Sequence, residues 1–264
     1  MVFAITEPDA GSNTHRLATT GERDGDAWVL RGQKYYISGF DEAAAVLVVA
    51  RTGAEDNGRE RLSLFIVPTD APGLSAVPLP VAAQIPEKQF TLFFDEVRLP
   101  AAALVGPEGG GFQQLFDGLN PERITGAAIC LGIARYALDR GVEYARARQV
   151  WSVPIGAHQG VAHPLAKARI ETSLAQLMTR QAAWAHDQGQ PAGELSNMAK
   201  YAAAEAANAA VDAAIQTHGG NGMSVEFGLV PMWGLARTLR IAPVSREMIL
   251  NYVAQHSLGL PRSY

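Results

Sequence analysis

The sequence predicts an α+β protein in which a β-barrel or β-sandwich domain is followed by a four-helix bundle. The first hundred residues contain short apolar runs separated by Gly and Pro, which is typical of strands and turns. After Gly109 to Gly111, Gly and Pro become sparse, and Ala, Leu, Ile and Arg recur at helical spacing. We therefore expect a β domain at 1–108 and a helical domain at 109–264.

Strands are predicted at runs of aliphatic and aromatic residues that are bounded by turn signals. Asp24-Gly25 is such a signal, and Pro68 closes another run. The continuous apolar run 43–50 suits a strand that is buried on both faces. The predicted strands cover residues 27–30 continuing through Gly32 into 34–39, and residues 43–50, 62–67 and 90–97. The charged stretch 56–61 is predicted to be a loop.

The helical pattern begins at Phe112 and continues to Pro154 as one or two helices. Pro121 stands where a second helix would begin, since proline is tolerated at the first helical position. Further helices are predicted at about 158–186, 194–218 and 246–257. The helix at 194–218 is rich in Ala, which allows neighbouring helices to approach closely, and Gly219-Gly220 ends it.

Composition argues against several functional classes. The net charge is −4 without a basic stripe, so we do not expect nucleic-acid binding. No apolar run has the length of a membrane span, and the N-terminus lacks the pattern of a secretion signal. The single cysteine, Cys130, lies in an apolar run and is expected to be a core residue in a reducing compartment, so a cytoplasmic location is predicted. No metal site is predicted.

Glycine-rich and polar motifs follow one another along the chain. Thr6-Glu7-Pro8-x-Ala10-Gly11-Ser12 is followed by Gly32-Gln33-Lys34-x-Tyr36-Ile37-Ser38, by Arg148, by His158-Gln159 and by Gln216-x-x-Gly219-Gly220-Asn221-Gly222. Each motif alone has a simple structural explanation, such as a turn, strand packing or a helix stop. In this order and approximate spacing they resemble the acyl-CoA dehydrogenase family, over its middle β domain and its C-terminal helical domain.

The resemblance implies FAD as the cofactor and an acyl-CoA thioester as the substrate of an oxidoreductase in fatty acid metabolism. The implied reaction is α,β-dehydrogenation, with a hydride passing to flavin N5 and electrons passing on to an electron-transfer flavoprotein. It also implies a homodimer or homotetramer, because residues of one subunit reach the FAD of its neighbour in this family. The family's N-terminal helical domain has no counterpart here, so a partner chain that supplies it is a further expectation.

The resemblance also assigns site residues. Ser12, Asn120 and Arg123 are implied as contacts of the acyl-CoA. Tyr36 and Ser38 stand where the family commonly has Trp and Thr, which keeps an aromatic face and a hydroxyl. The implied FAD-binding residues are Phe3, Ile5, Thr6, Gly11, Ser12, Tyr36, Ile37, Ser38, Arg148, Trp151, His158, Gln159, Gln216, Gly219 and Gly220.

The catalytic base has two candidates, because the reaction needs a carboxylate to remove the α-proton. Most of the family carries that Glu near the C-terminus, where this chain offers only Pro243 or Arg246. Glu122 stands where a minority of the family takes its base, and Glu247 is a second candidate. Two alternatives to a dehydrogenase therefore stay open: a flavin oxidase or monooxygenase of the same superfamily, and a truncated subunit that is non-catalytic or depends on a partner.

Overall fold

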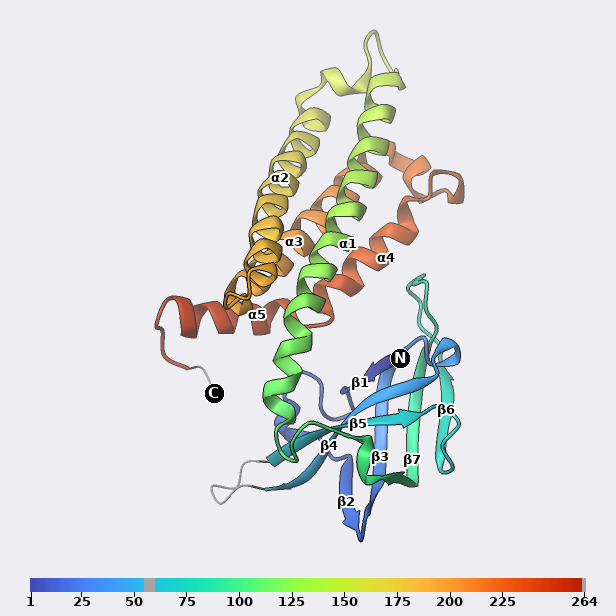
Figure 1. The fold of residues 1–264 in the computed structure, drawn as a ribbon. Helices are drawn as coiled ribbons and strands as arrows, with labels where there is room; N and C mark the ends of the chain where they lie inside the picture. Colours follow the sequence, from blue (N-terminus) through green and yellow to red (C-terminus); the bar gives the residue numbers. More distant parts are fainter. Residues whose placement is uncertain (55–59, 263–264) are drawn as a thin grey trace. The chain divides into compact units, whose positions relative to one another are not determined.

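The computed structural model describes residues 1–54 and 60–262. The chain divides into two compact units, Met1–Asp117 and Gly118–Tyr264, which are described separately below (Figure 1). The division falls inside a helix, whereas the sequence prediction separates the domains between residues 108 and 109, and that boundary stays a prediction.

The first unit is built on an eight-stranded sheet. Its strands are β1 (Val2–Ala4), β2 (Thr20–Asp24), β3 (Ala27–Ser38), β4 (Ala45–Ala54), β5 (Glu60–Pro68), β6 (Leu74–Leu79), β7 (Gln89–Pro100) and β8 (Leu104–Val105). Neighbouring strands pair in the order β6-β7-β3-β2-β4-β5-β8, and β1 adds to β4 in parallel. A T-shaped pair of Trp28 and Phe65, with ring centroids 5.1 Å apart, lies in the core of this sheet.

The predicted strands correspond to β3, β4, β5 and β7, and the Asp24-Gly25 turn joins β2 to β3 as an antiparallel hairpin. Strands β1, β2, β6 and β8 are additional to the prediction. Strand β6 contains Pro78, which fits its place at the edge of the sheet, because proline cannot donate a ladder hydrogen bond. Of the predicted loop 56–61, residues 56–59 lie outside the described residues, and Glu60 and Arg61 belong to β5.

The second unit is helical. Its helices are α1 (Gly111–Ala147, which begins in the first unit), α2 (Gln159–Asp187), α3 (Gly193–His218), α4 (Leu229–Ile241) and α5 (Arg246–Tyr252), followed by a π-helical turn at Val253–Ser257. A β domain followed by a bundle of helices confirms the predicted fold class. Helix α4 was not predicted, and the predicted helix 246–257 is divided between α5 and the π-helical turn.

Helix α1 resolves the choice between one and two helices. It continues without a break through Pro121, although a proline inside a helix leaves the carbonyl four residues earlier without its usual donor. The residues before and after Pro121 therefore belong to one helix, and the side chains of Asn120, Glu122 and Arg123 are presented by the same element.

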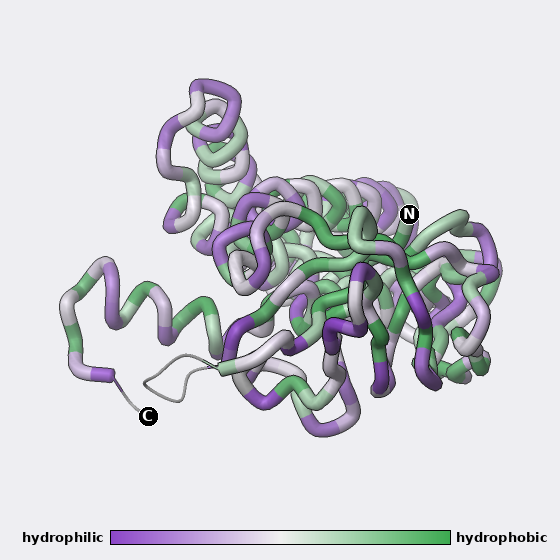
Figure 2. Tube along the Cα trace, turned by 60° about the horizontal axis from the view of Figure 1, so that its bottom comes forward, coloured by the Kyte–Doolittle hydropathy of each residue, from purple (hydrophilic) through white to green (hydrophobic). Residues whose placement is uncertain are grey.

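The core of the second unit is dominated by small side chains of α3. Figure 2 shows hydrophobic and hydrophilic residues alternating within the turns of the helices, which is the pattern of helices with one buried face. The alanines of α3 that are at most 2% exposed, here called the alanine seam, are Ala199, Ala203, Ala204, Ala206, Ala207, Ala210 and Ala214. Cys130 belongs to the same core at 0% exposure, as predicted. Within the described residues, no helix is long and apolar enough to cross a bilayer.

Candidate functional site

The segment that follows β1, here called loop 5–12, forms a tight turn on the surface of the first unit. The backbone groups of Glu7 and Ala10 exchange two hydrogen bonds of 3.1 and 3.2 Å, which close the turn. Ser12 is exposed and Thr6 is half-buried. The hydroxyls of both residues have no hydrogen-bond partner among the described residues. The backbone of loop 5–12 is therefore closed into a turn, and no group among the described residues occupies the two hydroxyls.

A buried ion pair lies directly behind this loop. Lys34 of β3 places Nζ 2.8 Å from Oε1 of Glu7, and the two side chains are only 0% and 5% exposed. Burial alone would raise the pKa of Glu7, but Lys34 and the hydrogen bonds outweigh it and hold that pKa below its ordinary value. Burial lowers the pKa of Lys34 to about 8, against the opposing effect of Glu7. Both groups are therefore charged at neutral pH.

Tyr36 has an unusual backbone conformation beside the same loop. The register of β3 against β7 shifts between Lys34 and Ile37, and Tyr36 in this bulge has a φ of 58°. A non-glycine residue in the left-handed region is strained, and such strain is frequent at functional sites. The bulge turns the Tyr36 ring outward, where it is 54% exposed and packs edge-on against Tyr35 at 4.4 Å.

The other predicted residues of this unit differ in accessibility. Phe3 in β1 and Ile5 are half-buried, and Gly11 is exposed, so that a Cβ added there would meet no atom within 4 Å. Ile37 is 2% exposed, so its side chain belongs to the core and only its backbone is accessible. The Ser38 hydroxyl donates to Oε1 of Gln89 over 3.0 Å.

In the second unit, Asn120, Glu122 and Arg123 lie near the start of α3, and we call this region the Glu122 end. Arg123 is 4% exposed, and its guanidinium donates to the carbonyl of Leu119 and to the side-chain oxygens of Asn120 and Asn197. The Glu122 carboxyl reaches solvent but is partly desolvated, which raises its pKa, while the charge of Arg123 opposes that shift. A carboxylate with a raised pKa is suited to accepting a proton.

Lys200 of α3 is a second buried cation in this unit. It is 1% exposed, and its Nζ donates to the carbonyl of Val244 over 2.7 Å. Burial lowers the pKa of Lys200 to about 8 and raises the pKa of the Cys130 thiol to about 12. The thiol is therefore neutral and unreactive. Glu247, the second candidate base, is exposed in the first turn of α5.

The predicted FAD-binding residues of the second unit gather at the opposite end of the helices, here called the Arg148 end. Tyr144 of α1 stacks on His218 of α3 at 4.2 Å, and its hydroxyl accepts a 3.0 Å hydrogen bond from Asn221. These contacts bring the last turns of α1 and α3 together. The residues of the Arg148 end are all exposed: Arg148, Trp151 (79%), His158, Gln159, Gln216, Gly219 and Gly220.

Helix α1 separates these two groups of residues. Glu122 and Ala147, the last residue of α1, are about 37 Å apart at 1.5 Å per residue. That distance exceeds the length of one extended dinucleotide, so a single cofactor cannot contact both ends of the helices. The predicted site residues of the helical unit thus lie in two separate regions, the Glu122 end and the Arg148 end.

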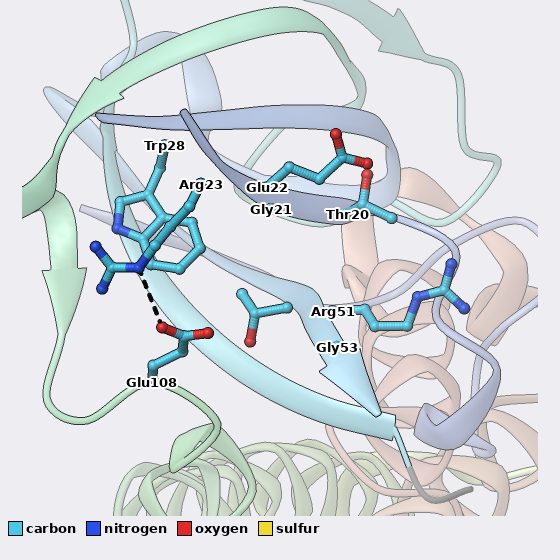
Figure 3. Close-up of a pocket in the computed structure, with 9 residues that line it drawn as sticks. Thr20, Gly21, Glu22, Arg23, Trp28, Arg51, Gly53 and Glu108 are labelled. Atoms are coloured by element: carbon cyan, nitrogen blue, oxygen red, sulfur yellow. Dashed lines mark hydrogen bonds and ion pairs between the residues drawn. The ribbon is translucent and has the colours of Figure 1, made fainter. Parts of the chain in front are cut away.

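A pocket of about 380 Å³ in the first unit contains none of the predicted residues. Figure 3 shows Arg23 lying over Trp28, with its Nε directed at Glu108. Arg51, which also lines the pocket, pairs with Glu60. Both arginines are thus neutralised by carboxylates of the same unit, and we assign the pocket no role. Among the described residues, no cluster of His, Cys, Asp or Glu is suited to hold a metal ion.

Three polar residues near the predicted site were not assigned roles from the sequence. Lys34 lies within one of the motifs, but nothing in the sequence connects it to Glu7, which is 27 positions away. Asn197 and Lys200 lie in the Ala-rich helix, where helical spacing places both toward the core. For Asn197 and Lys200, the sequence contains one signal of a special role, which is that a polar residue occupies a position expected to face the core.

Comparisons with known families match nearly the whole chain. The family model described as "Acyl-CoA dehydrogenase, middle domain" matches residues 2–97, and the model described as "Acyl-CoA dehydrogenase, C-terminal domain" matches residues 109–258.

Among individual proteins, acyl-CoA dehydrogenase FadE12 of Mycobacterium tuberculosis H37Rv is 59% identical over 266 aligned positions, covering 100% of this chain and 69% of that protein. A solved glutaryl-CoA dehydrogenase in complex with glutaryl-CoA is 30% identical with a TM-score of 0.93, covering 99% of this chain and 67% of the other. A glutaryl-CoA dehydrogenase from Mycobacterium smegmatis in complex with FADH2 is 27% identical with a TM-score of 0.91, and the match covers 100% of this chain and 67% of that one.

Proposed function

The chain belongs to the acyl-CoA dehydrogenase family, and from that membership we propose that it is an FAD-dependent enzyme that dehydrogenates the α,β bond of an acyl-CoA thioester. Its enzyme class is that of an oxidoreductase, as its relatives are named dehydrogenases. FAD, the direction of hydride transfer and the residue roles below are part of the proposal.

The observation that carries the proposal is the arrangement around loop 5–12. The hydroxyls of Thr6 and Ser12, which have no partner among the described residues, and the exposed ring of Tyr36 suit a planar, partly polar ring system such as a flavin. Phe3 and Ile5 add apolar surface, and Gly11 leaves the backbone open to close approach. Ile37 contributes through its backbone, and the Ser38 hydroxyl must share or give up its bond to Gln89.

When bound, FAD would accept the hydride that leaves the β-carbon of the substrate. The chain itself must remove the α-proton, and we assign that step to the Glu122 carboxylate. Its raised pKa and its accessibility favour it, and Arg123, fixed by three acceptors, holds the backbone of this turn. Glu247 is the weaker candidate, since it is exposed in the first turn of a seven-residue helix rather than partly desolvated like Glu122.

The Arg148 end supports a homodimer or homotetramer. Its exposed residues lie about 37 Å along α1 from Glu122, so they would contact a different cofactor from any that is bound at the Glu122 end. A guanidinium such as Arg148 suits a diphosphate, and Trp151, His158, Gln159, Gln216, Gly219 and Gly220 would contact the FAD of a neighbouring subunit. Helix α2 also carries an exposed apolar face of Ile170, Leu174, Leu177 and Trp184, which fits burial against another subunit.

Ser12 and Asn120 are the proposed contacts of the acyl-CoA. Arg123, which the sequence also suggested, has its donors occupied inside the helical unit and would act mainly by orienting Asn120. We propose that electron-transfer flavoprotein accepts the electrons and that the reaction belongs to fatty acid metabolism. The cytoplasmic location stays a prediction.

The visible spectrum of the purified protein tests the proposal. Retained flavin that bleaches without oxygen when acyl-CoAs are added supports the dehydrogenase, and the absence of flavin at micromolar FAD contradicts it. Rapid reoxidation by oxygen would favour an oxidase or monooxygenase. Bound flavin that no acyl-CoA reduces would favour a non-catalytic subunit.

A further inference from the structure

Four of the polar contacts that hold loop 5–12 against the rest of the first unit are made by two buried side chains, Glu7 and Lys34. Glu7 accepts hydrogen bonds from the backbone amides of Ala18 (2.6 Å) and Thr19 (3.1 Å) and from Lys34 Nζ. Lys34 Nζ also donates to the carbonyl of Ile5 over 3.1 Å. One ammonium group thus holds both the start of the loop and its acidic residue.

The same pair lies next to the Tyr36 bulge. Lys34 is the last residue of β3 in register before the shift, and the amide of Tyr35 donates to the carbonyl of Thr6 over 2.8 Å. Movement of Lys34 would therefore alter both the position of Thr6 and the bulge that turns Tyr36 outward.

We propose that Glu7 and Lys34 are positioning residues, which fix the Thr6 hydroxyl and the Tyr36 ring relative to each other so that a flavin meets a preformed site. Neither side chain touches the ligand, because both are buried beneath the loop. The inference rests on the proposed flavin function of loop 5–12.

The burial of the Glu7–Lys34 pair indicates that its main effect is on geometry rather than on stability. A buried ion pair contributes little to stability compared with an apolar pair of the same shape, although removal of one partner is costly. The principal effect of the pair is then geometric, and displacement of groups around a ligand by about 1 Å can cost a hundredfold in function.

The test uses three variants of the pair: Lys34→Met, Glu7→Gln and the double variant that carries both substitutions. Leu99→Ala is the control. Leu99 is 3% exposed at the far end of β7, so its truncation destabilises the same unit without touching loop 5–12. FAD affinity is measured by quenching of flavin fluorescence, stability by urea unfolding, and loop order by amide hydrogen exchange of the flavin-free protein.

We expect Lys34→Met to weaken FAD binding about tenfold or more. The double variant should recover stability, because no unpaired charge stays buried, but not FAD affinity, because a methionine side chain cannot donate to the carbonyl of Ile5. Glu7→Gln keeps an acceptor for Ala18 and Thr19 and provides a milder variant if Lys34→Met does not fold. Recovery of both properties in the double variant, or an equal loss of FAD affinity in Leu99→Ala at matched stability, would overturn the inference.

Hydrogen exchange separates this inference from the proposed function. If the wild-type protein binds no FAD, the proposed function fails, and the exchange of the Ala10, Ala18, Thr19 and Tyr35 amides still decides the positioning role. Faster exchange confined to these amides in Lys34→Met supports it, and exchange that changes uniformly across the unit contradicts it.

Discussion

Lys200 on α3 donates from Nζ to the carbonyl oxygen of Val244 over 2.7 Å, and so ties the Ala-rich helix to the segment that precedes α5. The ammonium is 1% exposed and has no carboxylate within ion-pair distance among the described residues. A buried cation in this situation weakens the folded state whenever it is protonated, yet it makes a contact that an apolar side chain cannot replace.

The pH dependence of stability is predicted to differ between the wild type and Lys200→Met. The folded-state pKa of Lys200 is lowered to about 8, so between pH 8 and the ordinary lysine pKa the unfolded state binds more protons. The wild type therefore gains stability from Lys200 as pH rises through this window, and the neutral amine keeps its bond to Val244. Urea unfolding should show a larger deficit of Lys200→Met at about pH 9.5 than at about pH 7. Equal deficits would contradict the lowered pKa.

The substitution Glu122→Gln is predicted to abolish substrate reduction of the flavin while leaving the oxidised flavin spectrum unchanged. General-base catalysis contributes about 10²–10⁴-fold, so turnover should fall by at least two orders of magnitude. Glu247→Gln is the matched control and should retain most activity. The reverse result would assign the base to Glu247. Because partial burial raises the pKa of Glu122, wild-type kcat/KM should fall toward low pH with a midpoint above that of an ordinary glutamic acid.

Asn197→Ala is predicted to destabilise the second unit by about 1–3 kcal/mol, since it leaves a donor of the buried Arg123 without a partner. Asn197→Asp retains an oxygen at the same place and should cost less. Chemical denaturation of both variants decides the matter, and an Asn197→Ala variant as stable as the wild type would mean that solvent replaces the lost acceptor.

Gly32→Ala is predicted to destabilise the first unit by roughly 2 kcal/mol or more. Gly32 has a φ of 140°, and an added Cβ would lie 2.6 Å from the Thr19 hydroxyl and 2.7 Å from the Thr19 backbone. Gly25 also has a positive φ, at 64°, but nothing lies within 4 Å of the corresponding position, so Gly25→Ala should cost only about 1 kcal/mol. Thermal unfolding of both variants measures the difference.

The sequence predicted the fold class because the two units differ in the period of their apolar residues. Long elements such as β3, β7 and α3 were predicted within a few residues of their observed bounds. The shorter elements were missed for local reasons. Strand β2 is polar at Glu22, Arg23 and Asp24, and it is held in place by pairing with β3 rather than by its own pattern.

The candidate site could be predicted only where a motif marked it. Thr6 and Tyr36 were proposed as site residues from their place in motifs and Glu122 from the resemblance to the family, and all three assignments stay predictions. The distances between side chains follow from packing that no local pattern encodes. The Glu7–Lys34 pair joins residues 27 positions apart, and the burial of Arg123 depends on Asn197, which lies 74 positions further along the chain.

The alanine seam on α3 has a consequence for how this protein diverges. Alanine is already the smallest side chain with a Cβ, so only glycine can replace it without adding volume, at a cost of about 1 kcal/mol in helix stability. A larger side chain at a position such as Ala207 or Ala210, each 0% exposed, costs about 1–3 kcal/mol by overpacking. Almost no neutral substitution is open at these positions, so random drift among descendants of this sequence should accumulate on the outer face of the helix and leave the seam unchanged.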